Sequence, residues 1–366
     1  MSETPPITPP IEPSLLIPPD FFFEVKSLVE SEFTVQDGYM KQGIPTFIIA
    51  PKETKEPFKR LVLKMKSSGY VPFLRKEEAG LTIRASLKPP ATKPSRIRVN
   101  ILLLFITLST VFVTGYLWGL NYSSVLKELD MPQVNSLIIA ALYLASIFGI
   151  IALHELGHKL TADKRGVEST LPYFIPGPPP YGTFGAVIMQ KEPPINRDQL
   201  FDLGSSGPLI GFIITVIVAI VGIKLSPVGP EISGASVLPT PLLFNIIAMT
   251  RSIPQGFTLY MHPVAFAAWF GFVLTFMNLM PAWQLDGGHV ARAVLGPQWH
   301  LASSFIGALI LILTNWWLMG ILVLFLSIRG RHPGPLDDVS PLSKSRNVIA
   351  VVIVLVIALS LVSAPL

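Results

Sequence analysis

The chain contains six long apolar segments, and this pattern constrains the fold more than any other feature of the sequence. Most of the segments are close to the ~20 residues that an α-helix needs to cross the hydrocarbon core of a bilayer. They are residues 101–120, 137–160, 204–224, 261–282, 301–328 and 347–364. A mean hydropathy of +0.56 and a charged fraction of only 14% agree with this pattern. The sequence therefore predicts a polytopic α-helical membrane protein embedded in a lipid bilayer.

The fifth apolar segment is long for a single span and is interrupted by Asn315, Trp316 and Trp317. If every segment crossed the membrane once, the basic residues between 329 and 346 would lie on the outer side, against the positive-inside rule. We therefore expect residues 301–328 to form two short segments in a re-entrant hairpin. The count is then about six to seven membrane segments.

Charges around the first span predict the orientation of the chain. Four basic residues precede this span, whereas the lysine after it is balanced by two carboxylates. These are Lys88, Lys93, Arg96 and Arg98 before the span, and Lys127, Glu128 and Asp130 after it. The positive-inside rule then places the N-terminus in the cytosol and the end of the second span near the cytosolic leaflet. No signal or transit peptide pattern is evident, so we expect a prokaryotic cell membrane.

The residues before the first span have the composition of a separate domain. The sequence predicts four parts: a proline-rich disordered tail at residues 1–19, a small soluble α/β domain at 20–87, a linker at 88–98 and the membrane domain at 99–366. Within the small domain we expect helices at 21–32 and 55–67 and strands at 46–50, 71–74 and 81–85. A cytosolic regulator is one partner that such a domain would suit. The net charge of +5 is spread over connecting segments, which does not indicate nucleic-acid binding.

The second apolar segment ends in His154-Glu155-Leu156-Gly157-His158. Histidines four residues apart on a helix share a face and can bind one zinc ion, and the glutamate between them can act as a general base. The alternative for Glu155 is an ion pair with Lys159, four residues further on. A catalytic zinc site uses three protein ligands, so a third ligand is needed. The chain contains no cysteine, and this ligand must therefore be nitrogen or oxygen.

The candidate for the third ligand is Asp286, which closes the fourth apolar segment. Its alternative role is that of a turn-forming aspartate, which the Asp-Gly dipeptide alone would suggest. We expect Gly288 and Pro281 to break the helix where the carboxylate turns toward the metal. Asn278, in the same segment, is either an interhelical hydrogen-bond donor or a group that holds the substrate carbonyl and its oxyanion. His289 either contacts the metal ligands from behind or is a solvated loop residue, and we expect the solvated loop residue. Three further histidines, His262, His300 and His332, have no partner spacing and stay unassigned.

Together these motifs resemble one protein family. His-Glu-Leu-Gly-His on one membrane helix, with Asn-x-x-Pro-x-x-x-Leu-Asp-Gly at residues 278–287 on a later one, is similar to the site-2 protease family of intramembrane zinc metalloproteases. The resemblance covers the membrane half of the chain. It implies hydrolysis of peptide bonds in or near transmembrane segments of membrane proteins, with Zn²⁺ on His154, His158 and Asp286 and with Glu155 as base. We expect no inserted PDZ-like domain between the spans and no CBS pair after the last one. The stretches Phe184-Gly185-Ala186-Val187-Ile188 and Asp202-Leu203-Gly204-Ser205-Ser206-Gly207-Pro208 look similar to the archaeal and chloroplast-type branch.

The loop between the second and third spans carries turn residues at 176–182 and β character at 183–189. It predicts a β-hairpin or edge strand near the active site, where an unwound substrate could add as a further strand. The alternative is a purely structural reverse loop. Small residues at 204–211 indicate close helix packing in the third span.

Two other functions fit part of this pattern. A non-proteolytic membrane chaperone or transporter could retain the zinc site for structure, although such a site needs no base like Glu155. A zinc protease of a different membrane clan would use a glutamate as its third ligand instead of Asp286.

Overall fold

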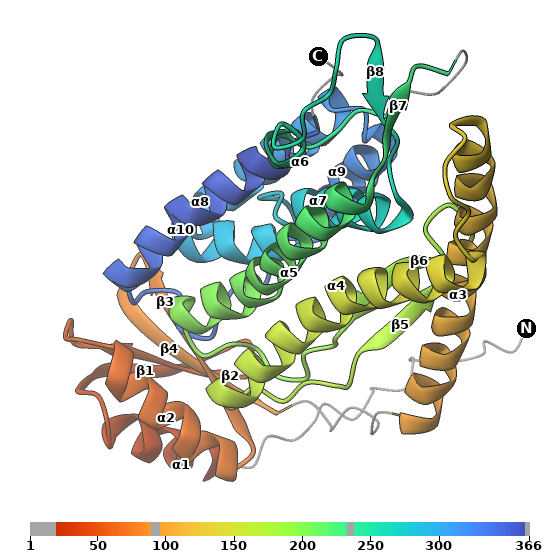
Figure 1. The fold of residues 1–366 in the computed structure, drawn as a ribbon. Coiled ribbons are helices and arrows are strands. Elements are labelled where there is room, and N and C mark those ends of the chain that lie inside the picture. The colour runs from red at the N-terminus through yellow and green to blue at the C-terminus, as the bar shows by residue number, and fades with distance from the viewer. Residues whose placement is uncertain (1–19, 89–95, 233–237, 363–366) are drawn as a thin grey trace, which may run out of the picture. The chain divides into compact units, whose positions relative to one another are not determined.

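The computed structural model describes residues 20–88, 96–232 and 238–362. Their contacts divide the chain into two compact units. One unit comprises residues 1–90 with 336–340, and the other comprises 91–335 with 341–366 (Figure 1). The predicted tail, residues 1–19, and most of the predicted linker lie outside the described residues.

The first unit is a four-stranded antiparallel sheet with two helices packed against it. The strands lie in the order β1-β2-β4-β3. The elements are α1 (Asp20–Glu30), β1 (Val35–Lys41), β2 (Ile44–Ile49), α2 (Lys55–Ser67), β3 (Tyr70–Glu77) and β4 (Gly80–Leu87). Phe47 and Ile49 of β2 are buried together with Phe58, Leu61 and Met65 of α2, because alternate strand residues and one helix face point into the same core. The two helices and three strands expected from the sequence are present.

Strand β1 was not predicted, and its composition explains why. Its residues Val-Gln-Asp-Gly-Tyr-Met-Lys are exposed or half-buried along the whole strand, so no apolar alternation marks it. It pairs with β2 through a turn in which Gln42 and Gly43 both have positive φ angles, 51° and 76°. Such a turn matches the twist of a hairpin. Pairing with its neighbour, rather than burial of its own side chains, makes this segment a strand.

A short segment from much later in the chain belongs to this unit. The Leu74 amide donates to the Leu336 carbonyl at 2.9 Å, and the Asp338 amide donates to the Leu74 carbonyl at 3.3 Å. Residues 336–338 thus extend the sheet as a parallel addition at β3, where Leu74 forms a bridge with Asp337. The hydroxyls of Thr54 and Ser340 also share a hydrogen bond of 2.9 Å. No local pattern in the sequence indicates this pairing.

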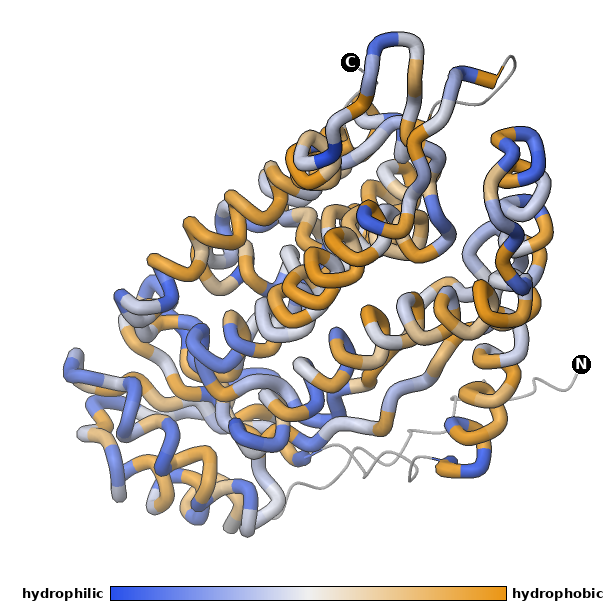
Figure 2. Tube along the Cα trace, viewed as in Figure 1, coloured by the Kyte–Doolittle hydropathy of each residue, from blue (hydrophilic) through white to orange (hydrophobic). Residues whose placement is uncertain are grey.

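The second unit is mostly helical. Its helices are α3 (Ile97–Glu128), α4 (Ser136–Arg165), α5 (Arg197–Leu225), α6 (Leu242–Ala248), α7 (Pro263–Asn278), α8 (Asp286–Leu313), α9 (Trp317–Arg329) and α10 (Lys344–Ser360). Its strands are β5 (Tyr173–Pro176), β6 (Thr183–Val187), β7 (Val228–Pro230) and β8 (Phe257–Leu259). Figure 2 shows that α3, α4, α5 and α10 are apolar along most of their length.

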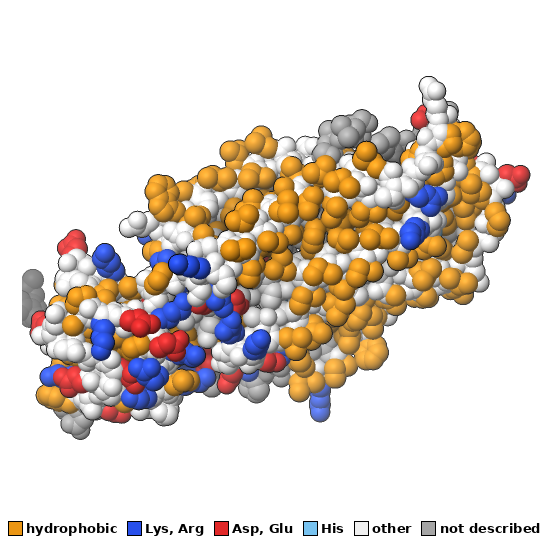
Figure 3. All heavy atoms as spheres, turned by 60° about the vertical axis from the view of Figure 1, so that its left-hand side comes forward, with side chains coloured by type: hydrophobic (Ala, Val, Ile, Leu, Met, Phe, Trp, Pro, Cys, Tyr) orange, Lys and Arg blue, Asp and Glu red, His pale blue; other side chains and the backbone are white. Residues whose placement is uncertain are grey.

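Among the described residues, four helices are long and apolar enough to cross a membrane: α3, α4, α5 and α8. Exposed apolar side chains such as Phe105, Ile213 and Phe325 contribute to broad apolar surface, and Figure 3 shows such side chains gathered over one face. Soluble monomers rarely expose apolar patches of this extent. The chain is therefore an integral membrane protein. The shorter apolar helix α7 is buried over nearly all of its length, so it packs inside the protein.

The region predicted as a hairpin at 301–328 contains two helices. Helix α8 ends at Leu313, Asn315 turns the chain with a φ of 66°, and α9 runs back against α8. However, α8 begins at Asp286, well before the apolar segment from which it was predicted. Its first half is more polar, and the helix is kinked where Gly296 has a φ of 78°. Hydropathy therefore located only the second half of this helix.

The predicted hairpin between the second and third spans is confirmed. Strands β5 and β6 are antiparallel partners. Three side chains hold the turn that joins them: the Trp118 indole donates to the Pro180 carbonyl at 2.9 Å, Tyr143 donates to the Tyr181 carbonyl at 3.1 Å, and Thr110 donates to the Gly182 carbonyl at 2.7 Å. These bonds fix the hairpin to α3 and α4, the helix that carries both motif histidines.

Candidate metal centre

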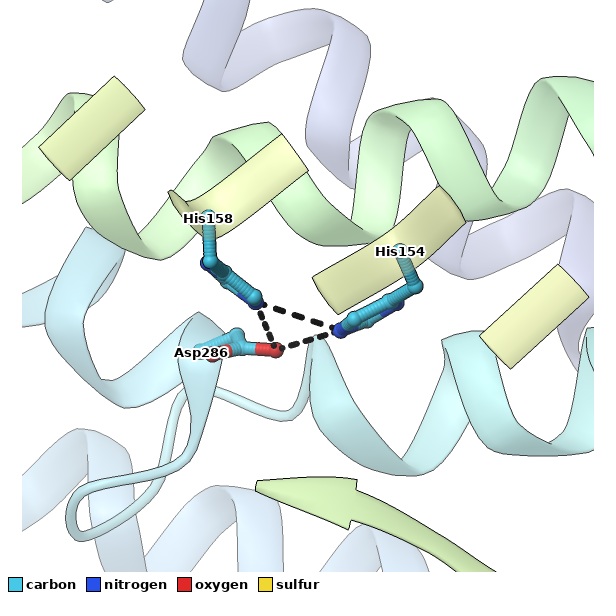
Figure 4. Close-up of side chains that lie close together, drawn as sticks. All are labelled: His154, His158 and Asp286. Atoms are coloured by element: carbon cyan, nitrogen blue, oxygen red, sulfur yellow. Dashed lines mark hydrogen bonds and ion pairs between the residues drawn. The ribbon is translucent and has the colours of Figure 1, made fainter. Parts of the chain in front are cut away.

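The structure brings His154, His158 and Asp286 together (Figure 4). The two histidines lie one turn apart on α4, and Asp286 is the first residue of α8. The Nε2 atoms of the two histidines are 3.2 Å apart, and each lies 3.3 Å from Asp286 Oδ2. His154 is only 4% exposed, whereas His158 and Asp286 are half-buried. Two motifs separated by more than 120 residues thus meet at one point.

These separations fit a tetrahedral zinc site. Ligand atoms bound at about 2.0–2.1 Å from one centre, at tetrahedral angles, lie about 3.3 Å from one another. The observed distances of 3.2 and 3.3 Å match that value. Among the described residues, these three form the one group of three or more His, Asp or Glu side chains that lie close enough together to share a metal ion. The donor set of two imidazoles and one carboxylate is one that zinc accepts.

The surroundings orient His158 for this role. Its Nδ1 lies 2.7 Å from the Leu203 carbonyl and donates to it, which leaves the lone pair of Nε2 directed at Asp286. Gly207 on α5 makes room for the ring, because a Cβ at this position would lie 2.1 Å from His158 Nε2. At Gly211 a Cβ would lie 3.0 Å from His154 Nδ1. The small residues predicted to bring helices close therefore also accommodate both imidazoles.

The two glycines after Asp286 have a different role from the one expected. Gly288 does not break a helix as expected, because both glycines lie in the first turn of α8, whereas Pro281 lies between α7 and α8. A Cβ at Gly287 would lie 2.0 Å from the Leu279 carbonyl oxygen, and one at Gly288 would lie 2.5 Å from the Ala282 carbonyl oxygen. Only glycine allows α8 to begin so close to the preceding loop. The loop at 279–285, rather than the glycines, separates α7 from α8.

Glu155 is 6% exposed and lines a cavity of about 230 Å³ together with the three clustered residues. It does not pair with Lys159, which instead binds Asp163 at 2.7 Å. Asn278, the last residue of α7, lines the same cavity. Residues 186–188, at the end of β6, do so as well. Every site residue expected from the sequence therefore faces one cavity.

Sequence reasoning missed the arrangement of the remaining histidines. The expectation that His289 is a solvated loop residue is wrong. It lies one helical turn after Asp286, is half-buried, and its Nδ1 is 2.7 Å from His332 Nε2. The His300 and His332 rings are 5.1 Å apart. If the sequence had predicted that a helix begins at Asp286, His289 would have been expected one turn further along that helix. No feature of the sequence indicated that His332 is its partner. His262 caps α7 by accepting from the Val264 amide.

The chain is similar to known zinc metalloproteases. Residues 142–314 match the model of peptidase family M50. The chain is 31% identical over 170 residues to the probable chloroplastic zinc metalloprotease EGY2 of Arabidopsis thaliana, covering 45% of this chain and 30% of that protein. It is 27% identical over 202 residues to a zinc metalloprotease of Methanocaldococcus jannaschii, covering 53% and 48%. The chain thus spans 30% and 48% of the length of these two relatives.

A solved structure also aligns with the chain. The site-2 protease from Methanocaldococcus jannaschii is 23% identical, covers 59% of this chain and 83% of its own chain, and superposes with a TM-score of 0.27.

Proposed function

The match of residues 142–314 to peptidase family M50 confirms the resemblance to the site-2 proteases, and on this premise we propose that the chain is an intramembrane zinc metalloprotease. It hydrolyses peptide bonds in or near transmembrane segments of membrane proteins. The observation that carries this proposal is the spacing of His154, His158 and Asp286 inside helices long enough to cross a membrane. These three residues would hold Zn²⁺.

Glu155 is the general base. When bound, the zinc supplies a Lewis acid that lowers the pKa of a water molecule to about 7. The Glu155 carboxylate takes a proton from the attacking water and passes it to the leaving amine nitrogen. Its burial beside the ligands keeps this proton from exchanging with bulk water before the transfer. The Asn278 amide, on the same cavity, would donate to the oxyanion that develops on the scissile carbonyl.

The hairpin supports a mode of substrate binding. A transmembrane helix hides its peptide bonds in internal hydrogen bonds, so the substrate must extend before it can be cleaved. In the described part of the chain β6 has β5 as its one strand partner, and residues 186–188 lead into the cavity. An extended substrate added at the outer edge of β6 would satisfy its exposed amides and lie beside Glu155.

The proposed location follows from charge. The last turn of α4 carries Lys164 and Arg165, just beyond the motif histidines. By the positive-inside rule this end of α4, and the N-terminal unit, lie in the cytosol of a prokaryotic cell. The N-terminal unit, proposed at residues 20–87, then serves as a cytosolic regulatory module that binds a partner protein. Residues 99–366 form the protease domain.

The alternatives receive less support. A structural zinc site is usually closed by a fourth protein ligand, whereas here a cavity of about 230 Å³ adjoins the three ligands and contains Glu155. This favours a protease over a chaperone or transporter that retains zinc for structure. An aspartate, rather than a glutamate, completes the group, which disfavours a different membrane clan.

The proposal is tested by cleavage of a labelled single-span peptide with the purified protein in detergent. Wild type is compared with Glu155→Gln, with a chelator, and with Glu168→Gln, an exposed glutamate that does not line the cavity. We expect cleavage by wild type and Glu168→Gln, and a loss of at least about 100-fold in Glu155→Gln although its zinc content is unchanged. Cleavage that persists in Glu155→Gln contradicts the role of the base. Absence of cleavage in zinc-loaded wild type across several substrates contradicts the protease.

A further inference from the structure

A short chain of hydrogen bonds in the helical unit ends at the metal cavity. The Gly334 amide donates to Nδ1 of His332 at 2.9 Å, and Nε2 of His332 lies 2.7 Å from Nδ1 of His289. His289 lines the cavity that contains the three candidate ligands and Glu155. The reaction described above assigns no role to this histidine.

The direction of each hydrogen bond in this chain follows from its first member. A backbone amide can only donate, so Nδ1 of His332 must accept and carries no proton. The proton of this neutral ring therefore lies on Nε2, which donates to Nδ1 of His289. Burial lowers the pKa of His332 to about 2, which agrees with a neutral ring. Nδ1 of His289 thus also accepts, and the proton of His289 is held on Nε2.

The Nε2 proton of His289 has no acceptor among the described residues. In the described part of the chain, the bond to His332 is the one hydrogen bond that the His289 side chain makes. The two nitrogens of an imidazole point to different sides of the ring. Because Nδ1 is directed at His332, Nε2 is the polar atom that His289 presents to the metal cavity. An N–H donor therefore faces this cavity.

The donor lies close to the reacting groups. His289 follows Asp286 by one turn of α8, and residues three apart share a helix face, so its ring lies on the face that carries the third candidate ligand. Asn278, at the end of α7, lines the same cavity. Two neutral donors, an imidazole N–H and a carboxamide, are thus available beside the metal centre. Fixed donors of these types stabilise the oxyanion that forms in acyl transfer.

We propose that His289 is a catalytic residue whose Nε2–H donates a hydrogen bond to the oxyanion developing on the scissile carbonyl. His332 is the positioning residue that fixes the tautomer of His289. As water attacks the carbonyl carbon, the π electrons of the C=O bond move to oxygen, and they return when the C–N bond breaks. Glu155 carries the proton from water to the amine, so His289 keeps its own proton throughout. This inference rests on the proposed protease function and adds one donor to it.

The first experiment determines the tautomer of His289 in the full zinc-loaded chain in detergent. The histidines are labelled with nitrogen-15, and the NMR signals that disappear in His289→Gln are assigned to His289. We expect a protonated Nε2 and an unprotonated Nδ1 in wild type. In His332→Phe, which keeps an aromatic ring but cannot donate, we expect a mixture of the two tautomers. A protonated Nδ1 in wild type overturns the proposal.

The second experiment separates the donor from the space that the side chain fills. His289→Gln and His289→Met introduce side chains of equal length, of which only glutamine carries an N–H donor. The control is Gln298→Met, because Gln298 is exposed on α8 and does not line the metal cavity. Each variant is tested with a labelled single-span peptide and with a phosphonamidate analogue of it, whose tetrahedral phosphorus resembles the transition state. Zinc content reports whether each variant has folded.

We expect kcat to fall about 100-fold in His289→Met with KM nearly unchanged, because the lost bond forms only in the transition state. The affinity for the phosphonamidate should fall in parallel with kcat. His289→Gln should recover most of both losses, His332→Phe should lower kcat about 10-fold, and Gln298→Met should behave as wild type.

The proposal is overturned if zinc-loaded His289→Met cleaves as fast as wild type. It is also overturned if His289→Gln and His289→Met are equally impaired, since the loss would then come from the missing ring and not from the missing donor. If either variant loses its zinc, the tautomer of wild-type His289 decides. In each of these outcomes wild type still cleaves the peptide, so failure here is distinct from failure of the proposed protease.

Discussion

Replacement of Gly207 by alanine tests whether the close approach of α5 to α4 is what positions the metal ligands. The added Cβ would lie 2.1 Å from His158 Nε2, 2.4 Å from Cδ2 and 2.7 Å from Cε1. Real Cβ atoms essentially never come closer than 3.0 Å to another heavy atom, so the imidazole must shift by about 1 Å. Metal sites tolerate deviations of only about 0.2 Å from ideal ligand distances.

The displaced ring would also lose its hydrogen bond to the Leu203 carbonyl, now 2.7 Å. Loss of such a supporting bond alone typically weakens metal binding about 10–100-fold. Misplacement of the ligand itself adds to this, so we expect Gly207→Ala to bind zinc at least about 100-fold more weakly, or about 2.8 kcal/mol. Peptide cleavage should fall in proportion to the bound zinc.

The assay is zinc content after dialysis against a chelator of known affinity, with cleavage measured on the same samples. Gly149→Ala is the matched control, because Gly149 lies on α4 and a Cβ there meets nothing within 4 Å. This control should retain zinc and gain slightly in helix stability. If Gly207→Ala holds zinc as tightly as Gly149→Ala does, the packing of Gly207 does not position His158 and our reasoning is refuted.

Three further predictions concern stability. Arg346→Gln should lower the free energy of unfolding by about 3 kcal/mol, because the Arg346 guanidinium donates two hydrogen bonds to the Asp202 carboxylate, at 2.7 and 2.8 Å. The control is Lys344→Gln, at an exposed neighbouring position, and equal thermal midpoints of the two variants in detergent would contradict this prediction. The pKa of Glu32 is lowered, chiefly by its hydrogen bond with Lys64. The Glu32 carboxylate therefore contributes its full share to the free energy of unfolding of the N-terminal unit above the ordinary glutamate pKa of about 4.3, and this share is lost as pH falls through the lower pKa of the folded state. Hydrogen exchange should show that Glu32→Gln destabilises this unit at pH 7 and does so less at pH 3. A destabilisation that is the same at both pH values would refute this. Zinc at about 100 times its dissociation constant should stabilise chelator-stripped wild type by about 2.7 kcal/mol and Asp286→Ala far less, and equal shifts in the midpoint would exclude Asp286 as a ligand.

Much of the local structure was predictable because its causes are local. Apolar runs specify helices wherever backbone groups must be satisfied without water. The motif at 154–158 places two imidazoles on one helix face through helical geometry alone. The hairpin at β5 and β6 followed from turn residues and β-branched or aromatic neighbours. Strand β1 was missed because it is held by a partner strand and shows no apolar alternation of its own.

The start of α8 could not be located from hydropathy. Residues 286–300 are too polar to register as an apolar segment, yet they are helical, and residues 290–293 among them are buried. This misplacement hid the position of His289 and gave Gly288 the wrong role. Both glycines instead allow a close approach to the carbonyls of the preceding loop, which depends on where that loop lies in space.

The sequence by itself therefore determined the membrane character of the chain, its helices and the chemical types of the candidate ligands. Only the tertiary structure decided that Asp286 lies 3.3 Å from both histidines, that Gly207 makes room for His158, and that residues 336–338 join the sheet at β3. The physical reason is that helix and turn preferences act over a few residues. Contacts between distant segments depend instead on how complete elements pack, which no short stretch of sequence encodes.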